Sequence, residues 1–202
     1  MCYIAYYLKG VQMSNMRPMV GGSVPSITFK YRVRTDGKPI TFEDKSSSDN
    51  PFEWKDVTSE DLFKGKRVVM FSLPGAYTPT CSTFQVPGFE ENYEKIKSLG
   101  IDEIYVVSVN DTFVMRKWMI DCGVKNLYFI PDGNGKFTDA MGMLVNKEHL
   151  GFGHRSWRYA AVVNDMKIEQ WFEEPGINND GSDMDPYGET SPENVISYLE
   201  KK

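Results

Sequence analysis

Three short apolar runs, separated by segments with helical spacing, constrain the fold of this chain most strongly. They are rich in β-branched and aromatic residues, as buried strands are, and they lie at residues 67–73, 103–109 and 127–130. A helical pattern follows the first run as far as Gly100, and a second follows Asp111, which can cap a helix that ends near Cys122. Buried strands that alternate with helices predict parallel pairing, with the helices packed on the sheet.

Antiparallel strands are expected in the later part of the chain and near its start. Residues 160–163 and 168–172 flank a short turn and predict a hairpin, after which a loop leads to a final helix near residues 192–201. Residues 23–35 alternate apolar and charged side chains, which predicts an edge strand or a hairpin arm. This order of elements predicts an α/β fold of the thioredoxin-like type, in which helices flank a mixed central sheet.

The length of 202 residues suits one well-buried domain, which we expect over residues 20–202. Residues 1–19 are expected to be an N-terminal extension, either disordered or the product of a start assigned too early, with Met13 and Met16 as alternative starts. The formal net charge of -5 argues against nucleic acid or an anionic membrane surface as a partner. No apolar run approaches the roughly 20 residues that a transmembrane helix needs.

The cysteines are too few and too widely spaced for a disulfide framework, and their number is odd; they are Cys2, Cys81 and Cys122. No Cys-x-x-Cys pair is present, so the sequence offers neither a dithiol redox motif nor a zinc ribbon. The two histidines, His149 and His154, lack a partner at ligand spacing and are interpreted as loop residues rather than metal ligands. These features favour a reducing, cytoplasmic compartment.

One cysteine lies where chemistry is expected, at the end of the stretch Pro74-Gly75-Ala76-Tyr77-Thr78-Pro79-Thr80-Cys81. A predicted strand ends directly before this stretch, and helical spacing begins after it. Pro79 suits the first turn of a helix and Thr78 then falls at the cap position. Cys81 therefore meets the positive end of a helix, which favours a thiolate. Buried structural cysteines are also common, so these features alone leave a reactive and a structural Cys81 open.

The wider sequence resembles the peroxiredoxin family. The pattern Pro74-x-x-x-Thr78-x-x-Cys81 is similar to the active-site signature of that family, and its surroundings resemble the type-five branch, also called atypical or plant type II. Three further blocks resemble the same branch: Ser108-Val109-Asn110-Asp111-Thr112-Phe113-Val114-Met115, Pro131-Asp132-Gly133-Asn134-Gly135 and Gly153-His154-Arg155-Ser156-Trp157-Arg158-Tyr159. The resemblance extends over roughly residues 20–202.

The resemblance implies a thiol peroxidase for hydrogen peroxide and organic hydroperoxides, with Cys81 as the peroxidatic cysteine. Its thiolate would attack one peroxide oxygen, release water or an alcohol, and become a sulfenic acid. Thr78 would supply a hydroxyl and Arg158 a cation from a distant strand, while Pro74 would shield the thiolate from water. Arg155 is the rival candidate for the cation, and its other interpretation is a surface arginine with loop contacts.

The chain departs from several relatives because it lacks a second cysteine where they carry one. In some members the resolving cysteine lies in the late loop, here residues 173–194, and in plant-like members it lies in the strand that here contains Tyr105-Val106-Val107. Cys122 matches neither position and is interpreted as structural or incidental. We therefore expect a one-cysteine mechanism, in which an external thiol reduces the oxidised Cys81.

The resemblance also implies the partners of the reaction. It is closest to bacterial members that use glutathione and glutaredoxin, the latter expected here to act in trans, and thioredoxin stays open as the reductant. A homodimer is expected, and no metal, haem or flavin cofactor is implied. The alternative function is a peroxide sensor or redox-relay protein that uses the same cysteine.

The pair Pro87-Gly88 interrupts the helical pattern that follows Cys81, which predicts a break or a sharp kink in the helix. Two interpretations stay open. The kink is purely structural, or it lets the first helical turns unwind so that a bulky reductant can reach the sulfenic acid.

Overall fold

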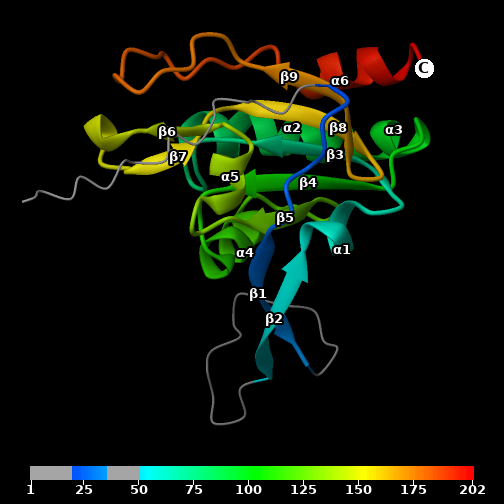
Figure 1. The fold of residues 1–202 in the computed structure, drawn as a ribbon, viewed down its shortest axis with the longest axis horizontal. Coiled ribbons are helices and arrows are strands. Elements are labelled where there is room, and N and C mark those ends of the chain that lie inside the picture. The colour runs from blue at the N-terminus through cyan, green and yellow to red at the C-terminus, as the bar shows by residue number, and fades with distance from the viewer. Residues whose placement is uncertain (1–19, 36–50) are drawn as a thin grey trace, which may run out of the picture.

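A mixed five-stranded sheet forms the centre of the molecule (Figure 1), in the computed structural model that describes residues 20–35 and 51–202. The strands run in the order β5-β4-β3-β8-β9. Their bounds are Tyr128–Pro131 for β5, Glu103–Ser108 for β4, Arg67–Ser72 for β3, Tyr159–Asn164 for β8 and Lys167–Glu173 for β9. β3, β4 and β5 pair in parallel, whereas β8 pairs antiparallel with both β3 and β9. This arrangement confirms the predicted mixed sheet of a thioredoxin-like fold.

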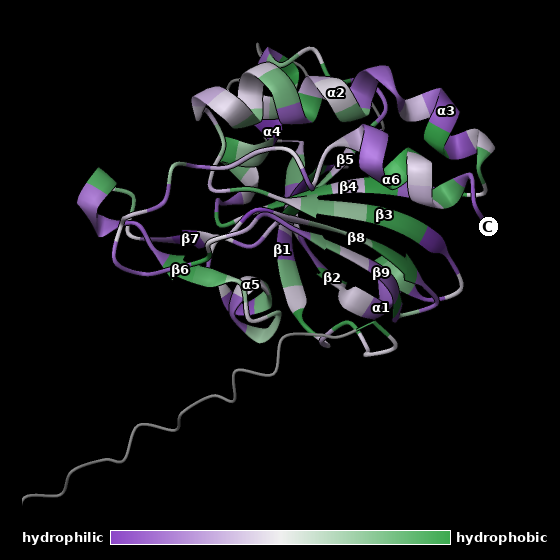
Figure 2. Ribbon diagram, turned by 90° about the horizontal axis from the view of Figure 1, so that it is seen from above, coloured by the Kyte–Doolittle hydropathy of each residue, from purple (hydrophilic) through white to green (hydrophobic). Residues whose placement is uncertain are grey.

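Side chains that alternate along the strands divide the core into two layers. On one face, Val69 and Phe71 pack against four helices, which are α2 (Val86–Glu91), α3 (Tyr93–Ser98), α4 (Thr112–Asp121) and α6 (Pro192–Leu199). On the other face, Val68 and Met70 pack against α1 (Ser59–Phe63) and α5 (Lys136–Ala140). Figure 2 shows the two sets of helices on opposite sides of the sheet. Burial on both faces explains why these strands are almost continuously apolar.

An antiparallel hairpin of β1 (Thr28–Arg34) and β2 (Phe52–Thr58) extends from the body of the fold (Figure 1). The hairpin arm was predicted for β1, but β2 was not predicted, because most of its side chains are exposed and it shows little apolar alternation. α1 then begins with a capping box, in which the Thr58 hydroxyl and the Asp61 carboxylate bond each other's backbone N–H groups.

Short elements between β5 and β8 were also absent from the prediction. They are α5, β6 (Leu144–Asn146), a 3₁₀ turn (Glu148–Leu150) and β7 (His154–Ser156), and β6 pairs antiparallel with β7. Segments of three to five residues carry too little periodicity to identify from sequence. The predicted extension over residues 1–19 lies outside the described residues.

The helical segment after β3 starts at residue 79 and departs from regular α-helix at once. Cys81–Gln85 forms a π-helical turn, in which the Val86 N–H donates to the Cys81 carbonyl. Pro87 lies in the first turn of α2, where its missing N–H is tolerated, and a second interruption at Asn92 separates α2 from α3. The predicted irregularity therefore takes the form of a π-turn before Pro87 and a break after α2.

Candidate active site

Cys81 lies at the first residue of the π-turn and is completely buried. The loop that carries the chain from β3 to this turn is fixed by polar contacts. The Ala76 N–H donates to Asn110 Oδ1 at 3.0 Å, and the Tyr77 hydroxyl donates to Asp121 at the end of α4 at 2.8 Å. Tyr77 has a left-handed backbone with φ of 61°, a conformation that non-glycine residues rarely adopt. The sequence thus holds Cys81 at the end of β3 through a closely tied loop.

Arg158 reaches Cys81 from a segment that is distant in the sequence. It directly precedes β8, whose Tyr159 pairs with Ser72 at the end of β3, so strand pairing brings residues 77 positions apart into contact. Its Nη1 donates to Cys81 Sγ at 3.4 Å and to Gln85 Oε1 at 2.5 Å. The guanidinium is only 1% exposed.

The remaining donors of Arg158 bond the late loop, between β9 and α6. Its Nη2 donates to Asp185 Oδ1 at 2.5 Å and its Nε to the Pro186 carbonyl at 3.0 Å. Burial opposes the charge of Arg158, but its electrostatic interactions and hydrogen bonds with Cys81 and Asp185 outweigh that effect and raise the pKa of the guanidinium. A permanently charged cation therefore faces the sulfur in a water-poor setting, where such contacts are strong.

The other two predicted site residues lie on the same loop and turn. Thr78 precedes the helix start as predicted, and its hydroxyl donates to the Gly75 carbonyl at 2.8 Å. Its own carbonyl accepts from the Ser82 N–H at 3.0 Å. Pro74 is buried, and both residues line a pocket of about 290 Å³ whose walls include Leu150 and Phe152. Cys81, Arg158, Thr78 and Pro74 are thus gathered at one end of the sheet.

Arg155, the rival cation, points elsewhere. Its Nη1 donates to the Val109 carbonyl at 3.0 Å, and within the described residues its hydrogen bonds go to backbone carbonyls and not to Cys81. Burial lowers the pKa of its guanidinium. Arg155 supports the loops around the site, which matches its alternative interpretation.

Cys122 lies at the C-terminal cap of α4, half-buried beside the core layer that contains Cys81. Burial, and then the negative charges of Asp121 and Cys81, raise the pKa of its thiol. A thiol whose pKa is raised is a poor nucleophile at neutral pH, because little thiolate is present.

Two residues that contact Arg158 were not predicted. Gln85 lies one helical turn beyond Cys81 and is completely buried, and its Nε2 has no hydrogen-bond partner among the described residues. Gln85 follows Cys81 by four residues in the predicted helix, so the sequence already indicated that the two side chains are neighbours on one helix face. The contact of Asp185 with Arg158 could not be predicted in this way. Asp185 lies in an acidic loop, and only the tertiary fold brings that loop next to Arg158.

A buried cysteine in contact with an arginine on a thioredoxin-like sheet is a candidate for a thiol redox site. Comparison with known proteins identifies the family. The model of the Redoxin family matches residues 19–187. A peroxiredoxin of Rhizobium etli is 53% identical, over 87% of this chain and 93% of its own length. A hybrid peroxiredoxin of Haemophilus influenzae is 46% identical, over 91% of this chain and 67% of its own length.

Solved structures give the same assignment. The 1-Cys peroxiredoxin known as Plasmodium falciparum antioxidant protein superposes with a TM-score of 0.78 at 33% identity, over 90% of this chain and 99% of that one. The chain belongs to the peroxiredoxins, as its sequence motifs implied. It is therefore a peroxidase of this family, with a peroxide substrate and a thiol reductant.

Proposed function

We propose that Cys81 is the peroxidatic cysteine and that it reduces hydrogen peroxide and organic hydroperoxides. Its thiolate attacks one peroxide oxygen, the S–O bond forms as the O–O bond breaks, and the departing oxygen leaves as water or an alcohol after taking up a proton. The contact of 3.4 Å between Arg158 Nη1 and Cys81 Sγ carries this proposal. A buried guanidinium at that distance favours the thiolate and stabilises the negative charge that moves between sulfur and oxygen.

Cys81 acts in this proposal without a second cysteine of its own chain. The late loop and β4 contain no cysteine, and the raised pKa of Cys122 makes its thiol a poor resolving group. The similarity to a structure described as a 1-Cys peroxiredoxin supports the same reaction cycle. An external thiol attacks the sulfenic acid and displaces water, and a second thiol then breaks the mixed disulfide and restores Cys81.

Glutathione with glutaredoxin is the proposed reductant, in a reducing cytoplasm, and thioredoxin is the alternative. The proposal rests on the sequence resemblance of residues 155–171 to bacterial members that use glutathione. Because Cys81 is completely buried, a bulky reductant needs the first turns after β3 to open. The π-turn at Cys81–Gln85 is suited to such opening, since it departs from regular helix.

A reductant panel tests the proposed cycle. Peroxide consumption is measured with glutathione plus glutaredoxin, and separately with thioredoxin, for the wild type, Cys81→Ser and Cys122→Ser. We expect turnover with glutathione and glutaredoxin in the wild type and in Cys122→Ser, and none in Cys81→Ser. Retained activity in Cys81→Ser would refute the role of Cys81, and lost activity in Cys122→Ser would refute the one-cysteine cycle. A single oxidation that no thiol system reverses would instead support the alternative, a peroxide sensor or redox relay.

A further inference from the structure

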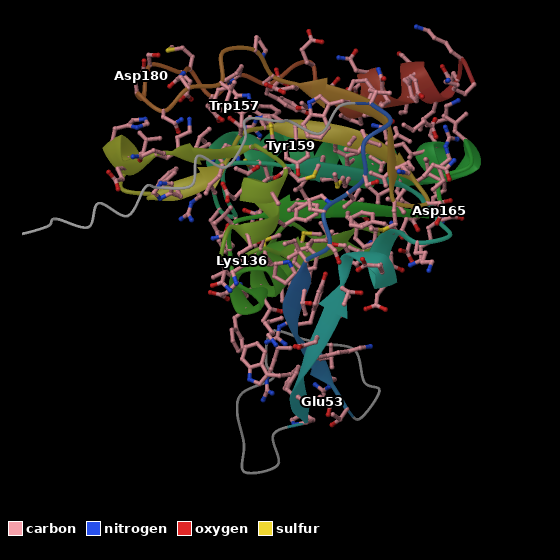
Figure 3. The ribbon with its side chains drawn as sticks, viewed as in Figure 1. Glu53, Lys136, Trp157, Tyr159, Asp165 and Asp180 are labelled. Carbon is pink, nitrogen blue, oxygen red and sulfur yellow. The ribbon has the colours of Figure 1, made fainter. Side chains whose placement is uncertain are left out.

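The late loop closes over the site and is fixed at its base by a buried carboxylate. Glu174 follows β9 and is 2% exposed. It accepts hydrogen bonds from the Gly188 N–H at 2.8 Å, the Thr190 N–H at 2.9 Å and the Thr190 hydroxyl at 2.8 Å. The loop extends outward as far as Asp180, labelled in Figure 3, and returns toward α6. Its two ends are therefore held together, and the residues between them have a defined path.

Asp185 is the residue of this loop that reaches Arg158. Its carboxylate is 43% exposed, while the guanidinium that it bonds is 1% exposed, so the loop brings a negative charge from the surface to a buried cation. The backbone of Asp185 is left-handed, with φ of 49°. Aspartate tolerates this conformation better than most residues. The neighbouring Pro186 carbonyl accepts from Arg158 Nε, so two successive residues bond the same guanidinium.

A second ion pair anchors the loop next to Asp185. The Lys147 ammonium donates to Asp183 Oδ2, and both side chains are almost fully buried, at 3% and 6% exposure. Asp183 Oδ1 in turn accepts from the Asp185 N–H at 3.2 Å. The Lys147 ammonium also lies 5.0 Å from the ring centre of Trp157, the residue before Arg158. The position of Asp185 is thus set by a contact to the β6–β7 hairpin.

These contacts fix the orientation of the guanidinium. A guanidinium is planar, and its donors point in fixed directions. When Nε and Nη2 are bonded to the Pro186 carbonyl and Asp185, Nη1 is directed at Cys81 Sγ and Gln85. Without Asp185, one edge of the group loses its charged acceptor and the plane can rotate away from the sulfur.

We propose that Asp185 is a positioning residue for peroxide reduction, which acts by holding Arg158 against Cys81. The inference rests on the roles proposed above for Cys81 and Arg158, and it adds the late loop to the reactive site. Misplacement of a catalytic donor by a fraction of its bond length is enough to slow a reaction substantially.

Oxidation of the reduced protein by hydrogen peroxide, followed in a single turnover by stopped flow, isolates this step because no reductant is needed. We expect Asp185→Ala to slow the second-order rate constant about tenfold. Asp185→Asn keeps an acceptor oxygen of the same shape and should recover most of that loss. The matched control is Asp180→Ala on the same loop, whose carboxylate bonds the Ser182 N–H instead of Arg158. It should leave the rate within about twofold of the wild type.

The same measurement in an Arg158→Ala background separates positioning from general loop damage. If Asp185 acts through Arg158, Asp185→Ala changes the rate by less than about twofold once Arg158 is absent. Two results would overturn this inference and leave the proposed function intact. One is a tenfold loss from Asp185→Ala that persists when Arg158 is absent. The other is a wild-type rate in Asp185→Ala although Arg158→Ala is slow. A wild-type rate in Arg158→Ala would instead refute the proposed role of Arg158, and the inference with it.

Discussion

At the scale of single residues, the proposed chemistry depends on one buried guanidinium that bonds four acceptors. Arg158 bonds sulfur, a side-chain amide, a carboxylate and a backbone carbonyl, and it lies in a segment that only the tertiary fold brings next to Cys81. A lysine at this position would keep the positive charge. It would lose the planar fork that lets one group meet all four acceptors.

We therefore predict that Arg158→Lys slows oxidation of the reduced protein by hydrogen peroxide by about 10²-fold, as expected for loss of an oriented charged donor. Stopped-flow kinetics measure the rate. Arg155→Lys is the matched control, because Arg155 donates to backbone carbonyls and its substitution should change the rate by less than about twofold. Equal losses in both variants would contradict the assignment of the cation to Arg158.

At the scale of elements, the late loop is held in place by charge-assisted hydrogen bonds. Burial opposes ionisation of Glu174, but the hydrogen bonds from Gly188 and Thr190 together outweigh it and lower the pKa of the carboxyl. A carboxyl whose pKa is lowered by folding stabilises the protein above its usual pKa. That contribution is lost as the pH falls through the lowered value.

Glu174→Gln should lower the free energy of unfolding at about pH 7 by about 1–2 kcal/mol, since the amide keeps an acceptor but not the charge. The difference from the wild type should stay constant down to the usual pKa of a glutamate, about 4.3, and should shrink only as the pH falls below it. Urea unfolding at several pH values measures both effects. Glu189→Gln, an exposed residue of the same loop, is the control. A difference that stays constant below that pKa would contradict the account of Glu174.

Prediction from sequence succeeded for elements whose signals are local. The Asp111 cap of α4 and the hairpin of β8 and β9 both lie where their residues indicate. It failed for α5, β6 and β7, which have only three to five residues each, and for β2, whose side chains are mostly exposed. The same division holds in the site. The Cys81 turn has a local signature, whereas Asp185 acquires its place only when the late loop folds back.

At the scale of the whole molecule, we propose a homodimer whose interface lies near the reactive end of the sheet. Large apolar side chains remain exposed beside Cys81, notably Tyr77 at 53% and Phe84 at 61%. Phe84 lies on the π-turn itself, so a second subunit that covered it would shield the site. Covering such side chains at an interface removes apolar surface from water, which favours association.

Light scattering coupled to size exclusion tests this proposal. The wild type should have the mass of two chains, and Phe84→Glu should shift it toward one chain, because a buried charge opposes association. Val20→Glu is the control, since Val20 is 58% exposed and adjoins Gly21, which bonds Ile168 at the opposite end of the sheet. A wild type with the mass of a single chain would contradict the proposed dimer.

The most direct test of the one-cysteine account is the chemical state of the protein after one equivalent of hydrogen peroxide. The reduced chain is oxidised in the presence of dimedone, which traps sulfenic acids, and is then analysed by intact and peptide mass spectrometry. The account predicts a single dimedone adduct on Cys81, with Cys122 still a free thiol. A disulfide between Cys81 and Cys122, or an adduct on another cysteine with Cys81 unmodified, would contradict it.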